Sequence, residues 1–122
     1  MNAGLWVLQG LLAALFLFSG GMKSTQSEQK LVVSGQTGVE GLPPTLIRFI
    51  GICEIFGAVG LILPRLSNVM PLLTPVAAGG LGLIMMLAAI VHYRRNEAGT
   101  VLLNILILLG CTAVAYGRLR WP

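Results

Sequence analysis

The chain has 122 residues, of which 56% are hydrophobic and only 10% are charged, and its formal net charge is +4. Ordinary soluble domains carry about 25% charged residues, so this composition excludes a soluble domain and predicts an integral membrane protein. The length predicts a single transmembrane domain over residues 1–122. We expect no nucleic-acid partner, because the basic residues stand singly or in pairs at the ends of apolar runs, where they anchor helices at lipid headgroups.

The first apolar run predicts a spanning helix over residues 4–22, closed by Lys23. The N-terminus lacks a basic region and a convincing cleavage site, so we expect a retained helix and no signal peptide. Residues 24–44 are polar and rich in glycine, which predicts a long loop between the first two helices. A short interfacial helix around residues 27–33 is compatible with that loop.

The second apolar run predicts a helix over residues 45–63 that Pro64 ends, since proline disrupts a helix interior. The third run predicts a helix over residues 70–93. Pro71 and Pro75 fall in its opening turns, where a missing amide hydrogen is tolerated.

The fourth run predicts a helix over residues 98–116, with Arg118, Arg120 and Trp121 anchoring the C-terminus. The predicted fold is therefore all-α, a transmembrane four-helix bundle with antiparallel helices and both termini on one side. The basic residues divide evenly between the two sides, so they do not fix the orientation. We expect a multi-pass protein of the cell inner membrane with cytoplasmic termini.

Glu54 lies near the middle of the second helix and so close to the midplane of the bilayer. An acidic group there costs about 2.5 to 3.5 kcal/mol, so it usually faces the interior of a bundle and finds a partner. Small residues share its helix face, which predicts close packing of another helix. The glycines that we expect at helix contacts are Gly51, Gly57, Gly79, Gly80 and Gly82.

Antiparallel threading places five polar side chains in the half of the bundle nearest the long loop. We expect a polar pocket with Glu54 and Asn104 at its floor and with Lys23, Arg48 and His92 around its mouth. Two states of Glu54 remain open: an ion pair with Lys23, or a protonated carboxyl group that donates to Asn104. Purely structural roles as headgroup anchors or interhelical hydrogen bonds are the alternative for each of the five.

Three stretches of the sequence resemble the DoxX-like family of small four-helix membrane proteins: ALFLFSGGMK at 14–23, RFIGICEIFGAVGLILP at 48–64 and AAIVHYRR at 88–95. The resemblance covers nearly the whole chain. It implies family-typical polar positions at Lys23, Arg48, Glu54 and His92. Some relatives are linked to quinone-coupled thiosulfate oxidation or to membrane redox complexes, and more distant four-helix proteins act as assembly chaperones.

The leading hypothesis is a binding or accessory protein that holds a small amphipathic ligand, such as a quinone, a lipid or an organic acid, between its helices. One alternative is a quinone-linked oxidoreductase subunit, with Glu54 and His92 as a proton path and a membrane redox partner as electron donor. The other alternative is a membrane-protein assembly factor. We also expect the chain to form a homodimer.

The sequence shows no complete catalytic motif, so no catalytic residue is assigned. Cys53 and Cys111 form no CxxC pair or metal-ligand pattern, and we expect no metal site. A quinone is the only cofactor that we expect, and membrane lipids are the expected surroundings.

Overall fold

The computed structural model describes residues 2–120 and contains four long α-helices in this range. These are α1 (Asn2–Thr25), α3 (Pro44–Ser67), α4 (Leu73–Arg94) and α5 (Ala98–Arg120). Each is long and apolar enough to cross a membrane. The prediction of an all-helical protein with four membrane-spanning segments is confirmed. Trp121, the expected C-terminal anchor, lies outside the described residues.

Between α1 and α3 the chain forms the short helix α2 (Glu28–Val33) and the 3₁₀ helix η1 (Thr37–Val39). Ser27 caps α2, since its side chain accepts a hydrogen bond from the backbone N–H of Lys30. The predicted short helix around residues 27–33 is thus present.

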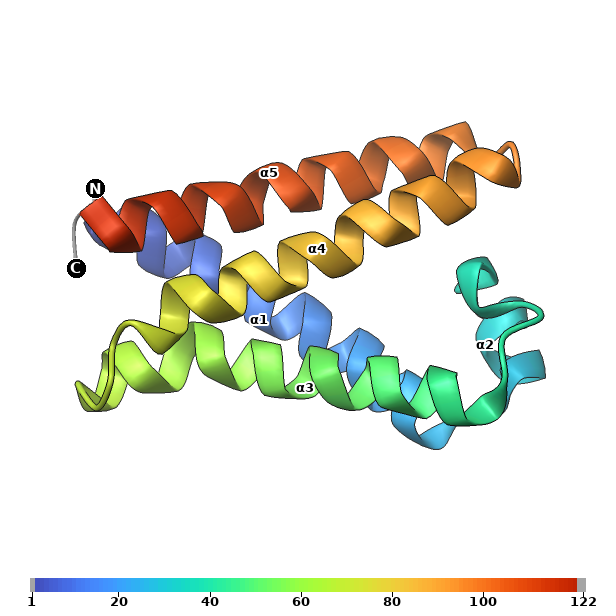
Figure 1. Cartoon of the computed structure of the whole chain (residues 1–122), viewed down its shortest axis with the longest axis horizontal. Helices are drawn as coiled ribbons and strands as arrows, with labels where there is room; N and C mark the ends of the chain where they lie inside the picture. Colours follow the sequence, from blue (N-terminus) through green and yellow to red (C-terminus); the bar gives the residue numbers. More distant parts are fainter. Residues whose placement is uncertain (1, 121–122) are drawn as a thin grey trace.

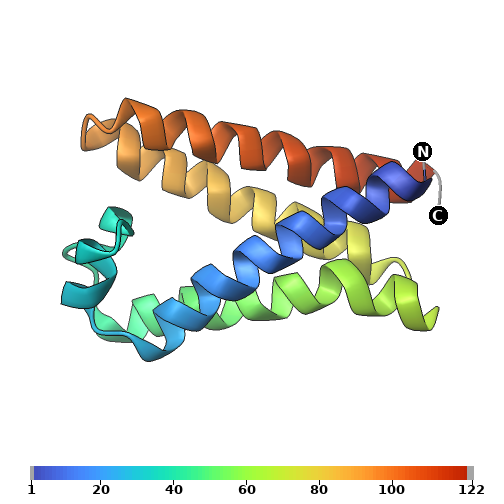
Figure 2. The same ribbon diagram turned by 180° about the vertical axis from the view of Figure 1, so that it is seen from behind.

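The four long helices form two pairs, α1 with α3 and α4 with α5 (Figure 1). The pairs come together at the end of the molecule that carries both chain termini, here called the terminal end. They diverge towards the opposite end, the loop end, where α2 and η1 lie between them (Figures 1 and 2).

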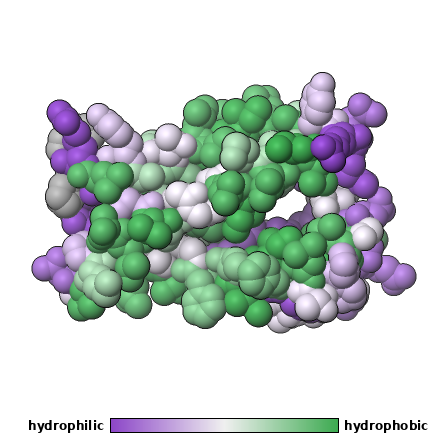
Figure 3. Space-filling model, in the orientation of Figure 1, coloured by the Kyte–Doolittle hydropathy of each residue, from purple (hydrophilic) through white to green (hydrophobic). Residues whose placement is uncertain are grey.

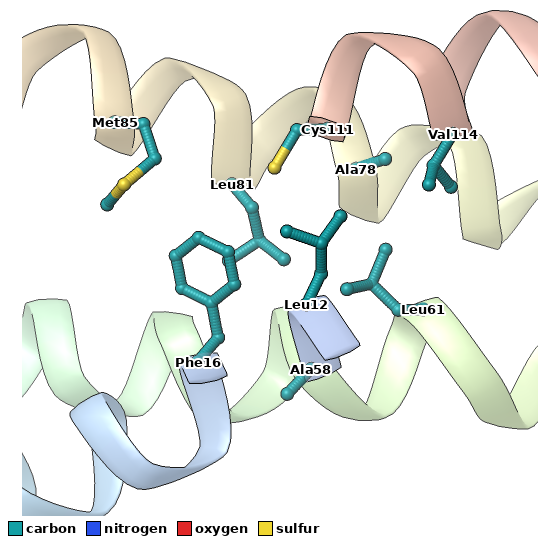
Figure 4. Packing of buried hydrophobic residues seen from close by; sticks show 9 residues of the cluster. All are labelled: Leu12, Phe16, Ala58, Leu61, Ala78, Leu81, Met85, Cys111 and Val114. Carbon is teal, nitrogen blue, oxygen red and sulfur yellow. The ribbon is translucent and has the colours of Figure 1, made fainter. Parts of the chain in front are cut away.

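Buried apolar side chains from all four long helices make the main core (Figure 4). They are Leu12, Phe16, Ala58, Leu61, Ala78, Leu81, Met85, Cys111 and Val114. A second cluster at the loop end joins Leu31 of α2 and Val39 of η1 to Ile47 of α3. The segment between α1 and α3 is therefore docked on the bundle by its own small core.

The predicted end of the second helix at Pro64 is wrong, because α3 continues to Ser67 with Pro64 inside it. Asn68 then ends the helix in the left-handed conformation, with φ 57°. The connection consequently falls after Asn68, and α4 begins at Leu73 rather than near Met70.

Hydrogen bonds from neighbouring helices explain why Pro64 does not break α3. Proline has no amide hydrogen and disturbs the preceding turn, so carbonyl groups there need other donors. The Thr74 hydroxyl of α4 donates to the Gly60 carbonyl at 3.0 Å. Gln9 of α1 donates through Nε2 to the Leu61 carbonyl at 2.5 Å.

Replacing Thr74 by valine should destabilise the protein by about 0.5 to 2 kcal/mol, the range of interhelical hydrogen bonds in membranes, because the Gly60 carbonyl loses its donor. Denaturation in mixed detergent micelles measures the loss. In a Pro64→Ala background the amide of residue 64 can bond to Gly60, so the cost of Thr74→Val should shrink. An equal cost in both backgrounds would contradict this explanation.

Candidate functional site

A buried ion pair joins α1 to α3. Glu54 is only 1% exposed, and Lys23 Nζ lies 3.0 Å from its Oε1 and 3.1 Å from its Oε2. The Ser19 hydroxyl donates to the same Oε1 at 3.1 Å. Of the two partners considered for Glu54, the structure brings Lys23 to it, and within residues 2–120 no hydrogen bond joins Glu54 to Asn104.

Two glycines allow this pairing, because they bring the backbones of α1 and α3 into close contact. A Cβ atom on Gly20 would lie 2.6 Å from the Gly51 carbonyl oxygen. One on Gly51 would lie 2.8 Å from the Cβ of Lys23. Larger residues at these positions would push apart the segments that carry Lys23 and Glu54.

Arg48 holds the end of α1 and does not line the cavity described below. Its guanidinium donates to the Lys23 carbonyl at 2.6 Å and to the Gln26 carbonyl at 2.5 Å. Carbonyl groups in the last turn of a helix lack intrahelical donors, so Arg48 caps α1. It fixes the backbone of Lys23. Contrary to the expectation from the sequence, Arg48 does not face the pocket.

A cavity of about 400 Å³ lies at the loop end, between the two helix pairs and beneath the α2–η1 segment. We call it the loop-end cavity. Figure 3 shows the molecule hollowed between α3 and α4 at this end, with polar residues visible inside. Most of the wall is apolar. The polar side chains in its lining are those of Ser19, Lys23, Gln36, Glu54, His92, Thr100 and Asn104.

Asn104 projects from α5 into this lining and is only 7% exposed. Its amide nitrogen Nδ2 is buried and has no hydrogen-bond partner among the described residues. A buried polar group without a partner costs about 1 to 3 kcal/mol. Asn104 therefore brings to the lining of the loop-end cavity a donor that has no protein partner, the kind of group that a bound molecule or water satisfies.

His92, which is 7% exposed, lies where α4 meets the loop. Its Nδ1 is 2.6 Å from Oε1 of Glu97, and the Thr37 hydroxyl donates to Oε2 of Glu97 at 2.8 Å. The other ring nitrogen, Nε2, lies against η1, since a Cβ on Gly38 would be 3.0 Å from it. Glu97 thereby links the histidine to the loop that covers the cavity.

Sequence reasoning missed Glu97 because it stands in a hydrophilic turn. Asn96 adopts φ 60° just before it, which turns the chain back so that Glu97 reaches the histidine five positions earlier. An asparagine before the first residues of a helix is the signal for such a turn. Arg95 completes the cluster with ion pairs to Glu40 at 2.9 Å and to Glu97 at 3.4 Å.

A model of the DoxX-like family matches residues 7–114. The chain belongs to the DoxX-like family. The matched range includes all four spanning helices in large part, the Lys23–Glu54 pair and every residue that lines the loop-end cavity. Neither the curated proteins nor the solved structures include a match to this chain. Over residues 2–120, no group of three or more His, Cys, Asp or Glu residues could hold a metal ion.

The other glycines expected at helix contacts in this DoxX-like protein fall into two groups. A Cβ on Gly57 would lie 2.6 Å from Cδ2 of Leu81, and one on Gly82 would lie 3.3 Å from Cδ1 of Leu108, so both positions are at helix contacts. Gly79 and Gly80 have no described atom within 4 Å of such a Cβ. The structure does not bring these two against another helix of the chain.

A second polar cluster, at the terminal end, was also missed. Arg118 is 3% exposed rather than anchored at a headgroup. It donates to Gln9 Oε1 at 2.6 Å and to Asn2 Oδ1 at 2.7 Å, and its guanidinium lies 5.2 Å from the centre of the Trp6 ring. Gln9 in turn bonds to α3, so this cluster joins α1, α3 and α5.

Substituting Lys23 by methionine should destabilise the DoxX-like protein by about 3 to 5 kcal/mol, because Glu54 would remain buried without its cation. Denaturation in mixed micelles measures this. The double variant Lys23→Met/Glu54→Gln should recover much of the loss, and Lys30→Met, at an exposed position of α2, serves as the control. Equal stability of Lys23→Met and the control would contradict the ion-pair model.

The contacts of Glu97 hold its pKa below the ordinary value of 4.5, chiefly through His92 and then through Thr37. Because the pKa is lowered, the cluster stabilises the fold above pH 4.5 and loses that contribution as the pH falls through the lowered value. Carbon NMR titration of the carboxyl groups should give a Glu97 midpoint below 4.5. Thr37→Val should raise that midpoint, since a donor to the charged form is removed; an unchanged midpoint would contradict the contact.

Proposed function

We propose that this DoxX-like protein is an antiparallel four-helix bundle of the cell inner membrane that binds a small amphipathic molecule in the loop-end cavity. The observation that carries the proposal is the buried Asn104 amide, which lacks a partner within the described chain and lines a cavity with mostly apolar walls. Such a mixture of apolar walls and few polar groups is typical of ligand sites between bundle helices. The termini face the cytoplasm.

The α2–η1 segment, which covers the loop-end cavity, supports a site that retains its ligand. Gln36 of this segment is within 3.4 Å of the Ser19 hydroxyl, Thr37 bonds to Glu97, and Glu40 pairs with Arg95. These contacts reach both helix pairs, so they hold the segment across the cavity. The ligand then enters from the lipid between α3 and α4, where the molecule is hollowed (Figure 3).

The role is binding rather than catalysis by this chain alone. Lys23 satisfies both oxygens of Glu54, and Arg48 caps a helix, so neither cation is free to activate a substrate. A quinone, a neutral lipid or an organic acid each offers an oxygen acceptor for Asn104. In a quinone-binding version, an electron donor would come from a partner protein.

Filling the cavity tests the proposal. Ala88 of α4 lines the cavity, and a phenylalanine there should occupy part of the volume and displace the bound molecule. Native mass spectrometry of protein released from membranes should show an adduct on the wild type that is mostly lost from Ala88→Phe. Ala113→Phe, on the exposed face of α5, is the matched control and should keep the adduct.

Organic extraction of the same samples identifies the molecule by its mass. Equal adducts on the wild type, Ala88→Phe and Ala113→Phe would show lipid bound to the outer surface and would contradict a ligand in the loop-end cavity.

A further inference from the structure

We infer that the loop-end cavity takes an uncharged head group that carries both a hydrogen-bond acceptor and a hydroxyl donor, as in a monoacylglycerol. The inference rests on the proposed function and specifies its ligand class. Three features of the cavity determine the ligand class. The cations are already paired, one polar group without a partner is a donor and another is an acceptor, and the remaining walls are apolar.

The cations near the cavity already have partners. Lys23 contacts both oxygens of Glu54, and Arg95 pairs with Glu40 and Glu97. Arg48 bonds to backbone carbonyls outside the cavity lining. An anionic head group would therefore meet no uncompensated cation, while it would lose its hydration on entry. This arrangement favours an uncharged ligand over a carboxylate or phosphate.

Asn104 sets the first requirement on that ligand. Its unpaired Nδ2 is a donor and is more than nine-tenths buried. Only an acceptor can satisfy it, such as the carbonyl oxygen of an ester. A purely hydrocarbon ligand would leave this amide unsatisfied.

His92 sets the second requirement. Nδ1 lies 2.6 Å from the Glu97 carboxylate, and in the tautomer whose Nδ1–H donates to that carboxylate Nε2 is an acceptor. No hydrogen bond to Nε2 from another described residue is present, and His92 lines the cavity. A ligand hydroxyl can donate to this nitrogen. Glu97 is thus a positioning residue that fixes which ring nitrogen accepts.

The remaining walls accommodate a hydrocarbon chain. Apolar side chains contributed by α1, α4 and α5 surround the polar groups: Leu15, Phe16, Phe18, Ile84, Leu103 and Ile107. A ligand with a single acyl chain and a compact, uncharged, hydroxylated head group matches all three features of the cavity.

Three probes with the same acyl chain separate these features: monodecanoylglycerol, decanoate and methyl decanoate. At about pH 8 decanoate is ionised, since carboxylic acids titrate near pH 4. Competition against a brominated monoacylglycerol, followed by native mass spectrometry, gives relative affinities for purified protein in detergent. Monodecanoylglycerol should bind the wild type at least about tenfold more tightly than either other probe, the effect of one to two hydrogen bonds.

Asn104→Leu and Glu97→Gln should each weaken monodecanoylglycerol binding by about five- to tenfold, through loss of one hydrogen bond or of its alignment. Glu97→Gln should change the binding of methyl decanoate by less than about twofold, because that probe has no hydroxyl to donate to His92. Thr112→Val is the control: its hydroxyl bonds to the Leu108 carbonyl of its own helix, outside the cavity. Helical content checks that each variant is folded.

Tighter binding of decanoate than of monodecanoylglycerol would overturn the inferred preference for an uncharged head group. It would not contradict ligand binding in the loop-end cavity. Unchanged monodecanoylglycerol binding by both variants would overturn the roles of Asn104 and His92. Failure of the wild type to bind the brominated monoacylglycerol or any of the three probes would overturn this inference, whereas the proposed function would fail only if the native adduct were equal on the wild type, Ala88→Phe and Ala113→Phe.

Discussion

A carboxylate that is buried within a membrane helix has to be compensated, and in this protein Lys23 does so for Glu54. The pair requires α1 and α3 to approach closely, which the contact of Gly20 with Gly51 permits. Arg48 then fixes the end of α1 that carries Lys23. The requirement to compensate Glu54 therefore determines how α1 and α3 pack. It also places an ion pair with no net charge in one wall of the loop-end cavity.

The two ends of the bundle treat their polar groups differently. At the terminal end, polar side chains join the helices: Gln9 bonds to Arg118 and to α3, and Thr74 bonds to the Gly60 carbonyl, while the buried Nε of Arg65 has no hydrogen-bond partner among the described residues. Such contacts tie helices together. At the loop end, the helix pairs diverge and the Asn104 amide is left with no described partner. Asn104 also lines the loop-end cavity, and this position marks the loop end as the candidate binding site.

The sequence was sufficient for the four helices that are long and apolar enough to span a membrane, because their apolar runs match the bilayer thickness. Four of the polar side chains that it grouped line one cavity: Lys23, Glu54, His92 and Asn104. It was not sufficient for the contacts. The end of α3 was misplaced because the bonds that tolerate Pro64 come from helices far along the chain.

Arg48 and Glu97 show the same limit at the site itself. Arg48 has the right depth for the cavity but the wrong direction, and helix rotation cannot be read from depth. Glu97 belongs to the site only because the turn at Asn96 returns it to His92. Hydrogen bonds made across turns and between helices depend on backbone geometry that periodicity does not specify.

An experimental structure of the protein in a lipid nanodisc prepared directly from membranes would test the central claim most directly, because it retains any native ligand. We predict non-protein density in the loop-end cavity, with an acceptor atom within hydrogen-bonding distance of Asn104 Nδ2 and an apolar portion between the helices. A cavity closed by protein side chains, with Asn104 bonded to another residue of the chain, would contradict a ligand-binding role.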